Sequence, residues 1–400
     1  MEIKRQNNFL FERYLICFLI FWGCWSSIFV LLLIKLGVHN GMVYAIKDAP
    51  VYLLMICSVS RWLFFREKLL VSILISIFLI YLFSNYIFLN FDYRNPVANI
   101  RQLIAPIVVL YFFCSIRLSG FDVRAIYGFL KLNLFVVFLW GGVELYFELW
   151  KKADLSLFFT LKGIPVDQYG LSYMFYEPII GYRERMTSSF LDPISLGHFF
   201  ACFFILAFYK KESFGKYRAL FLFISLLGLT LTFSKGAMLQ LFVALTVLNG
   251  FIPLVIRFFC ALMPLMVYLV IPNKTGINIH LSGLYNSITN INIFGYGIGS
   301  VGNYAKMFSD DLSVYYEKGI SDTYIGSLLG QIGSLGLFFW LFLMVLAIFP
   351  LSNRNRTPLI LLSSLIAVSA VSENTLNITS FLLPAVLIAM SRQSFTNKFT

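Results

Sequence analysis

The chain is a succession of apolar stretches of about 20 residues, the length of helix that crosses the hydrocarbon core of a bilayer. Its 400 residues are 59% hydrophobic and only 12% charged, whereas soluble domains carry about 25% charged residues. The sequence therefore predicts an all-α polytopic membrane protein with about twelve transmembrane helices. The predicted spans are residues 14–36, 43–65, 69–90, 99–117, 125–149, 194–209, 218–233, 235–252, 256–272, 323–350, 357–372 and 377–391.

Charge sets the orientation of these spans. If both chain ends lie in the cytoplasm, the cytoplasmic segments carry seventeen Lys and Arg residues against five Asp and Glu residues. The positive-inside rule requires such an excess, and it accounts for the net charge of +12 without nucleic acid as a partner. The basic segment 1–13 precedes a long apolar stretch without a small-residue cleavage site, so we expect a retained first span and not a signal peptide.

Two connections are much longer than the others, and both are predicted to lie on the outer side. They cover residues 150–193 and 273–322, and loops of this length are uncommon and usually functional. The first mixes aromatic and charged residues and is compatible with a short interfacial helix. The second is rich in Asn, Ser, Gly and Tyr, which suit hydrogen bonding to polyols. Neither resembles a separate domain, so residues 1–400 are expected to form a single membrane domain.

Ionisable residues on the predicted outer side are the strongest functional signal, because each is costly to bury in a membrane and the positive-inside rule does not explain them. Four places carry them. They are Asp92, Arg94 and Arg101; Glu177, Arg183, Glu184 and Arg185; Lys235; and Ser321, Asp322 and Tyr324.

Lys235 is the most informative of these residues. It lies in the segment LTLTFSKGAMLQ, at a short turn between two predicted spans and inside an otherwise apolar stretch. Two interpretations stay open: a lysine that snorkels to the interface, or an anion site at a helix N-terminus, where backbone donors also point toward negative charge.

Three other patterns carry no predicted site. The glycine-rich segment GYGIGSVG, residues 295–302, follows no predicted strand, so we interpret it as a turn-rich loop and not as a nucleotide-binding loop. His39, His198 and His280 are scattered, without a cluster at metal-ligand spacing. The six cysteines lie inside apolar stretches without paired spacing. Neither a metal nor another cofactor is expected.

Cations at the outer surface, together with hydroxyl-rich loops, suggest an anionic lipid-linked substrate that carries sugars. A diphosphate fits these cations, because arginine binds it with paired donors and lysine as a point charge. A glycosyl transfer at the outer face cannot draw on nucleotide sugars. Its donor would therefore be activated as a lipid diphosphate.

Four motifs narrow this interpretation further. In chain order they are RMTSSFLDPISLGHFF (185–200), LTFSKGAMLQL (231–241), NIFGYGIGS (292–300) and SDTYIGSLLGQIGSLGL (321–337). The ordered set resembles the O-antigen polymerase and O-antigen ligase superfamily over roughly residues 180–340, and the first half of the chain matches only in general character. The resemblance implies a glycosyltransferase of the GT-C type in the inner membrane of a Gram-negative bacterium, with its active site facing the periplasm.

The resemblance also implies roles for single residues. In the family, an arginine before the Asp-Pro motif contacts the diphosphate. This position corresponds to Arg185, with Arg183 as the near alternative. The arginine of the family's Ser-Arg-Gly turn corresponds to Lys235, which keeps the charge but loses bidentate geometry. The histidine of the ligases after the second long loop corresponds to Asp322, and this departure favours the polymerase.

The predicted activity is that of an O-antigen polymerase, which transfers the growing glycan from undecaprenyl diphosphate to a hydroxyl of an incoming lipid-linked repeat unit. Cations would stabilise the charge that grows on the leaving diphosphate. The candidates for this role are Arg185, Arg183, Lys235 and Arg101. Asp322 is the first choice for the base and Glu177 the second, and Ser321 and Tyr324 are the candidates for glycan contacts.

The expected partners are the undecaprenyl-diphosphate-linked oligosaccharide, membrane lipid and, as the family resemblance implies, a chain-length regulator. An O-antigen ligase is the closest alternative. A flippase for the same lipid-linked units is an alternative of a different class, but its cations should line a cavity at mid-span, and the predicted spans are nearly free of arginine.

Overall fold

The computed structural model describes residues 2–39, 41–64, 69–89, 96–116, 118–177, 183–248, 252–253, 256–257, 275–303, 305, 312–348 and 356–392. The fold is almost entirely helical, and the strands in these ranges are β1 (Tyr176–Glu177) and β2 (Arg183–Glu184). The predicted all-α class is therefore confirmed. The chain forms two compact units. Unit 1 comprises Met1–Tyr52, Ser115–Leu241 and Thr379–Thr400, and unit 2 comprises Leu53–Cys114 and Phe242–Ile378.

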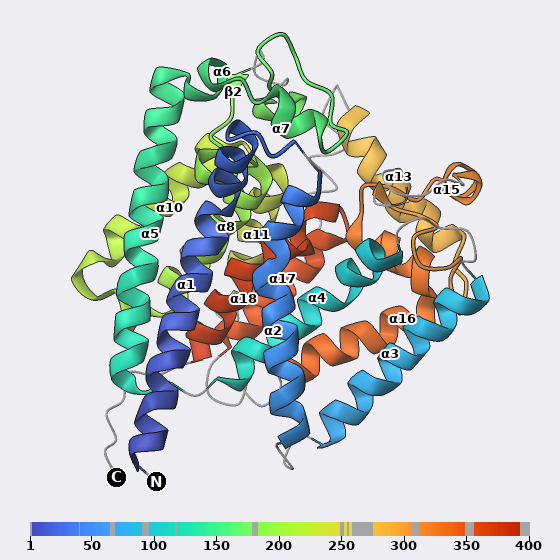
Figure 1. Cartoon of the computed structure of the whole chain (residues 1–400), viewed down its shortest axis with the longest axis horizontal. Coiled ribbons are helices and arrows are strands. Elements are labelled where there is room, and N and C mark those ends of the chain that lie inside the picture. Colours follow the sequence, from blue (N-terminus) through green and yellow to red (C-terminus); the bar gives the residue numbers. More distant parts are fainter. Residues whose placement is uncertain are drawn as a thin grey trace. The chain divides into compact units, whose positions relative to one another are not determined.

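Unit 1 is built from both chain ends and the middle of the chain (Figure 1). Its long helices are α1 (Glu2–Lys35), α5 (Gly120–Phe147), α8 (Pro193–Tyr209), α10 (Arg218–Thr232) and most of α11 (Lys235–Leu245) and α18 (Ile378–Arg392). Its short helices are η1 (Gly41–Tyr44), α6 (Leu149–Ala153), α7 (Ser156–Thr160), η3 (Tyr173–Phe175), η5 (Ser188–Phe190), α9 (Lys211–Phe214) and η6 (Gly215–Tyr217).

Unit 2 holds α3 (Leu69–Leu89), α4 (Pro96–Ser115), α13 (Thr275–Thr289), α15 (Ser313–Lys318), α16 (Tyr324–Ile348), α17 (Thr357–Ser369) and η8 (Glu373–Leu376). Helix α2 (Ala45–Phe64) starts in unit 1 and ends in unit 2.

Several helices have the length and composition of membrane spans. In the described ranges five are long and apolar enough: Glu12–Lys35, Ser72–Leu89, Gly120–Phe147, Lys211–Thr232 and Tyr324–Ile348. Shorter apolar helices cover Ile100–Cys114, Pro193–Tyr209, Lys235–Leu245, Thr357–Ser369 and Ser380–Ser391. The chain is therefore a helical membrane protein. Its number of spans stays a prediction, and predicted span 256–272 lies almost wholly outside the described residues.

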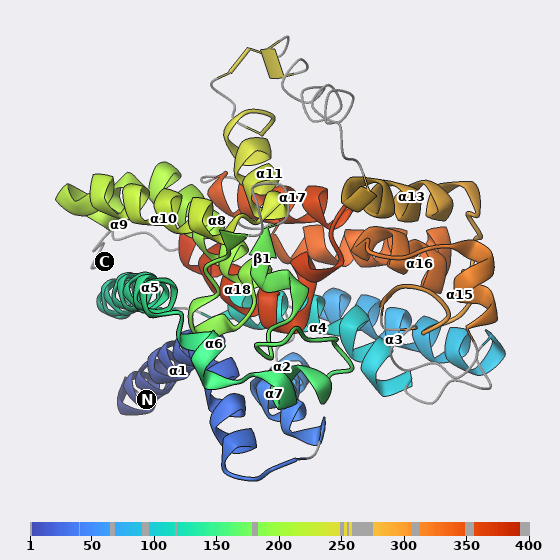
Figure 2. The ribbon, with the colours of Figure 1, turned by 90° about the horizontal axis from the view of Figure 1, so that it is seen from above.

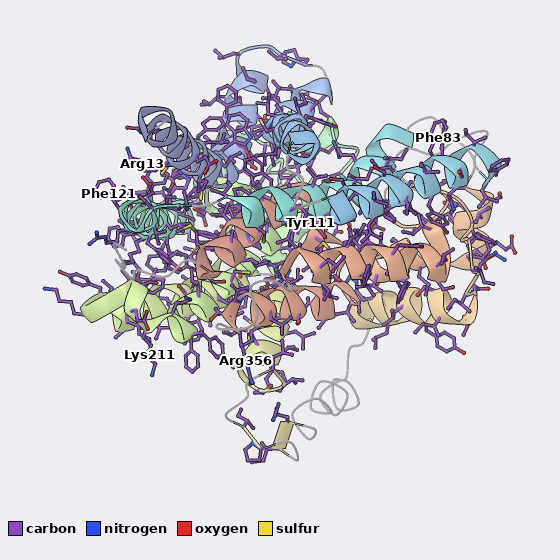
Figure 3. The ribbon with its side chains drawn as sticks, turned by 90° about the horizontal axis from the view of Figure 1, so that it is seen from below. Arg13, Phe83, Tyr111, Phe121, Lys211 and Arg356 are labelled. Atoms are coloured by element: carbon purple, nitrogen blue, oxygen red, sulfur yellow. The ribbon has the colours of Figure 1, made fainter. Side chains whose placement is uncertain are left out.

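In unit 1, α1 and α5 lie side by side (Figure 1). Arg13 of α1 forms an ion pair of 3.4 Å with Asp122, in the first turn of α5. Figure 3 shows Arg13 near Phe121, and the guanidinium carbon lies 5.7 Å from the centre of that ring. Ser119 caps α5, since its hydroxyl accepts a hydrogen bond from the Asp122 backbone N–H. These contacts join the two helices at one end.

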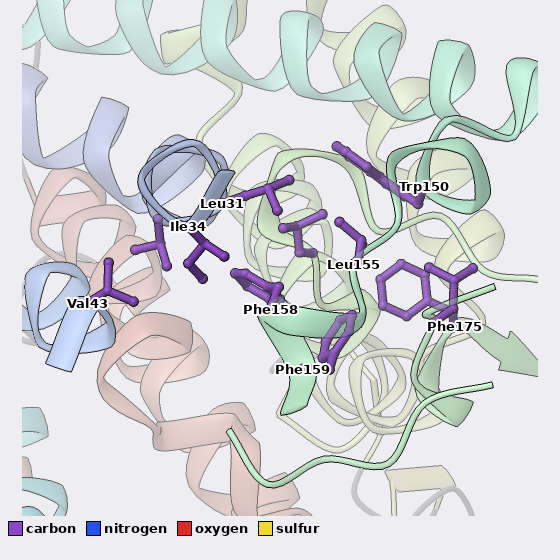
Figure 4. Packing of buried hydrophobic residues seen from close by; sticks show 11 residues of the cluster. Leu31, Ile34, Val43, Trp150, Leu155, Phe158, Phe159 and Phe175 are labelled. Carbon is purple, nitrogen blue, oxygen red and sulfur yellow. The ribbon is translucent and has the colours of Figure 1, made fainter. Parts of the chain in front are cut away.

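The first long loop packs against α1 through an apolar cluster (Figure 4). Leu31 and Ile34 of α1 contact this cluster, and Phe158 and Phe159 of α7 meet edge to face with ring centres 5.1 Å apart. Removing aromatic rings of this size from water is strongly favourable. The predicted short helix in this loop is represented by α6 and α7, and the cluster holds the loop as a folded layer.

In unit 2, α3, α16 and α13 run side by side (Figure 2). Helix α13 lies within the predicted second loop, and no helix was predicted there. Its side toward α16 carries the buried residues Gly283 and Ser287. A Cβ at Gly283 would meet the backbone oxygen of Ser321, so only glycine permits this approach. Small residues at a spacing of four therefore replace the apolar stripe that usually reveals a helix.

Helix α16 is interrupted at Gly333, whose φ of 69° is left-handed. The segment 292–301 lies alongside this break and completes its hydrogen bonding. The Tyr296 N–H donates to the Gly330 oxygen at 2.7 Å, and the Ser334 N–H donates to the Asn292 oxygen at 2.9 Å. The glycine-rich segment predicted as a loop is thus a structural partner of the broken helix.

Candidate functional site

The four sequence motifs pack together in pairs. In unit 1 the Met186 N–H of the first motif donates to the Leu231 oxygen of the second at 2.9 Å. His198 and Gln240 share a buried hydrogen bond of 2.7 Å between the same two motifs. In unit 2 the third and fourth motifs meet at the break in α16, where Gly297 N–H donates to the Gln331 oxygen. Each pair defines one candidate site, and the two are described separately.

The site in unit 1 is centred on Lys235 and Glu177. Lys235 Nζ lies 3.0 Å from Glu177 Oε1; the lysine side chain is 58% exposed and that of Glu177 only 5%. Lys235 is the first residue of α11, and Ser234 before it accepts a hydrogen bond from the Ala237 N–H, as a helix cap does. Gly197 of α8 lies against Ser234 and lets the start of α11 approach closely.

Arg183 lies at the same place. Strands β1 and β2 pair antiparallel, so that Arg183 stands directly opposite Glu177, and its side chain is exposed. Glu184 forms an ion pair with Lys151 of α6, which fixes β2 to the first long loop. Three predicted site residues, distant in sequence, are thereby brought together: Glu177, Arg183 and Lys235. Asp92 and Arg94 lie outside the described residues.

Arg185 has a different position. Its Nε donates to the Thr232 oxygen at 2.8 Å, and its two terminal nitrogens donate to the Met174 oxygen at 3.2 Å and the Phe233 oxygen at 3.4 Å. Thr232 and Phe233 end α10, where unpaired carbonyls carry partial negative charge. Burial lowers the pKa of Arg185, and Asp192 and Glu177 oppose this shift. Arg185 therefore holds the turn that precedes Lys235 through one hydrogen bond from each of its three nitrogens.

Asp192, the acid of the Asp-Pro motif, interacts with further cations. It caps α8 by accepting hydrogen bonds from Ile194 N–H at 2.9 Å and Ser195 N–H at 3.3 Å. Lys47 and Lys162 both interact electrostatically with it. Burial and the repulsion of Lys47 place the pKa of Lys162 well below its usual value. Sequence analysis missed both lysines, because Lys47 lies in a predicted span and Lys162 among the many charges of the first loop.

The site in unit 2 is centred on Asp322. Its φ of 56° is left-handed, which is uncommon outside glycine and often found at functional positions. The Asn303 side-chain amide donates to Asp322 Oδ1 at 2.8 Å, and His280 Nδ1 lies 2.9 Å from the Asp322 backbone oxygen. Asp322 is half-buried and sits just before α16.

The other predicted residues of unit 2 differ in exposure. Ser321 is half-buried and lies beside the Tyr315 hydroxyl. Tyr324 is 1% exposed, and its hydroxyl donates to the Gln102 backbone oxygen at 2.8 Å. This core position does not favour the predicted glycan contact of Tyr324. Arg101 is half-buried on α4, one residue before Gln102.

Glu373 completes this cluster and was missed by sequence analysis. It is 5% exposed, and both its carboxyl oxygens lie 3.1 Å from the Asn303 backbone nitrogen. The sequence did contain a signal for Glu373, since it is an ionisable residue in the short turn between the last two predicted spans. Lys235 lies in a similar short turn between two other predicted spans. Among the residues that the structure describes, no three His, Cys, Asp or Glu side chains are grouped as metal ligands.

Compared with known proteins, the chain matches no protein-family model and no curated protein.

Proposed function

We propose that the chain is an O-antigen polymerase, a membrane glycosyltransferase acting on undecaprenyl-diphosphate-linked oligosaccharides at the periplasmic face of the inner membrane. The observation that carries the proposal is the assembly of Glu177, Arg183 and Lys235 in unit 1. These residues come from two of the places at which charge has no topological explanation. Two exposed cations, one paired with the buried Glu177 carboxylate and the other opposite Glu177 in the strand pair, suit a dianionic diphosphate better than a solitary snorkelling lysine.

In the proposed reaction the bond between the glycan's first sugar and the diphosphate breaks, and a new glycosidic bond forms to the acceptor hydroxyl. Undecaprenyl diphosphate leaves with the bonding electron pair. Lys235 and Arg183 stabilise the charge that grows on it, and an interaction that strengthens in this way lowers the barrier. Glu177 orients the Lys235 ammonium at 3.0 Å.

We assign the proton of the acceptor hydroxyl to Asp322 on the motif resemblance alone. Glu177 is the weaker candidate for this role, because its carboxylate is buried and already bound by Lys235. Asp322 is accessible, and one carboxylate oxygen is fixed by Asn303. Arg185 contributes by holding the turn before Lys235, since each of its three nitrogens donates to a backbone oxygen.

Deleting the gene and examining the surface polysaccharide on a gel tests this function. A polymerase deletion leaves a single repeat unit on the lipid A core, and the intact gene restores the ladder. A normal ladder in the deletion strain would refute the proposal.

A ligase is the second candidate, and one observation favours it. The ligases use a histidine after the second long loop, and His280 lies 2.9 Å from the Asp322 backbone oxygen. A histidine thus does occupy this neighbourhood, although it comes from α13. In the same gel a ligase deletion gives lipid A core without polysaccharide, while polymer accumulates on undecaprenyl diphosphate.

A further inference from the structure

Glu373 is a buried acid at the start of η8, in the turn between α17 and α18. Both its carboxyl oxygens lie within hydrogen-bonding distance of the Asn303 backbone N–H, at 3.1 Å each. Burying a carboxyl without compensation is costly. If position 373 served only the packing of the fold, an apolar residue or an amide would be more favourable there. The position of its partner indicates a more specific role.

Asn303 connects Glu373 to Asp322. Its backbone N–H contacts the Glu373 carboxyl, and its side-chain amide donates to Asp322 Oδ1 at 2.8 Å. Gly302, which precedes Asn303, has a φ of 90°, and a Cβ there would lie 3.3 Å from Glu373 Oε1 and closer still to Ser327. The backbone can approach the carboxyl because residue 302 is glycine. Asn303 is therefore held by Glu373 and in turn holds Asp322.

Asp322 has a second restraint on its other side. His280 Nδ1 lies 2.9 Å from the Asp322 backbone oxygen, while the backbone itself is left-handed. His280 thus fixes the main chain of Asp322, and Asn303 fixes its carboxylate. No described residue hydrogen-bonds to Asp322 Oδ2 in addition, so this is the oxygen that can receive a proton.

We propose that Glu373 is a positioning residue for Asp322 and acts through Asn303, so that Asp322 Oδ2 faces the acceptor hydroxyl. The inference rests on the proposed function, in which Asp322 takes the proton of that hydroxyl. Orientation of this kind matters because a displacement of about 1 Å in a reacting group can lower a rate by roughly a hundredfold.

The charges around Glu373 agree with this role. Burial, with a further contribution from the charge on Asp322, raises the pKa of Glu373 to about 8. At pH 7 Glu373 is therefore mostly protonated, so its carboxyl adds little negative charge beside Asp322. Among the residues that the structure describes, Tyr315, the His280 ring and the Gln102 amide also face the cluster, and the Gln102 amide lies beside the Glu373 carboxyl.

The test uses purified full-length protein, lipid-linked repeat units as substrate and the rate of polymer formation as the readout. Asn303→Leu removes the amide that holds Asp322, and Glu373→Ala removes the group that holds Asn303. We expect each to lower kcat by roughly tenfold to a hundredfold with KM within about twofold. Glu373→Gln keeps an uncharged acceptor for the Asn303 N–H, so it should retain kcat at pH 7.

The pH profile separates positioning from simple packing. Wild-type activity should change as the pH rises through about 8, because Glu373 then gains a charge beside Asp322, and Glu373→Gln should remove that change. The matched control is Asn286→Ala: Asn286 of α13 also donates its amide to a backbone oxygen, that of Gly319 at 3.0 Å, and not to the Asp322 carboxylate. It should leave kcat unchanged, and thermal unfolding checks that every variant folds.

Asp322→Asn distinguishes failure of the inference from failure of the proposed function. If it is inactive while Asn303→Leu and Glu373→Ala keep the wild-type kcat, Glu373 is not a positioning residue and Asp322 remains the base. If Asp322→Asn itself is fully active, the base assignment is refuted and the inference with it. A pH profile of Glu373→Gln identical to that of the wild type also overturns the inference.

Discussion

Arg185 and Arg183 are two residues apart in the chain, and the structure predicts opposite consequences for their loss. The Arg185 guanidinium donates hydrogen bonds of 2.8, 3.2 and 3.4 Å to three backbone oxygens. A hydrogen bond to a charged group contributes about 1.5–3 kcal/mol. The longest bond is weak and the side chain is only partly buried, so we expect Arg185→Ala to lower the free energy of unfolding by about 3 kcal/mol.

Arg183 is exposed, and no described residue pairs with its side chain. Arg183→Ala should therefore leave the unfolding temperature within about 1 °C of wild type, since surface substitutions rarely change stability by more than about 0.5 kcal/mol. It should nevertheless reduce polymer severely, because it removes the proposed contact with the diphosphate. Arg185→Lys, which keeps the charge but only one donor group, should fall between wild type and Arg185→Ala in stability.

Thermal unfolding of the detergent-purified protein measures stability, and polymer ladders at equal protein level measure activity. The two readouts should separate the two arginines. A wild-type unfolding temperature in Arg185→Ala would refute the conclusion that Arg185 holds the turn before Lys235. Full activity of Arg183→Ala would refute its contact with the diphosphate.

Three further predictions concern the remaining features. Lys235→Ala should nearly abolish polymer while Lys235→Arg keeps it, as ladders in a complemented deletion strain will show; an active alanine variant returns Lys235 to a snorkelling role. Gly333→Ala should lower the unfolding temperature, because its left-handed φ of 69° and the close Ile293 oxygen exclude a side chain, at a cost of about 1–3 kcal/mol; an unchanged temperature would contradict the interrupted helix. Glu373 has a pKa raised from 4.5 to about 8 in the fold, so the folded state binds its proton more tightly. The free energy of unfolding should therefore fall as pH rises from about 4.5 to about 8, by at most about 5 kcal/mol. Glu373→Gln should remove this slope in unfolding scans, and a slope identical to wild type would contradict the raised pKa.

The helices of this protein could be predicted because their signal is local. An apolar stretch of about 20 residues reports a span without reference to the rest of the chain. Helix α13 was not predicted, because its signal is not local. Its buried side carries Gly283 and Ser287, and the need for a small residue at position 283 becomes evident only from the close approach of Ser321.

The site residues show the same division. Lys235 was found because a cation in an apolar stretch is conspicuous, and its pairing with Glu177 could not be read from two positions so far apart in the chain. The role of Arg185 was hidden because its partners are backbone oxygens, which every residue possesses. Glu373 was not predicted as a site residue, because one acid in a short turn gives only a weak functional signal by itself. Its connection to Asp322 through Asn303 is evident only in the structure.

The central claim is that this chain polymerises lipid-linked repeat units, and the most direct test is to supply those units to the purified protein in lipid vesicles. Polymer on undecaprenyl diphosphate should form, with one undecaprenyl diphosphate released for each bond made, without added nucleotide sugar or lipid A core. The Lys235→Ala variant should form none. The central claim would be contradicted if folded wild-type protein formed no polymer but transferred preformed glycan to added lipid A core. That result would identify a ligase.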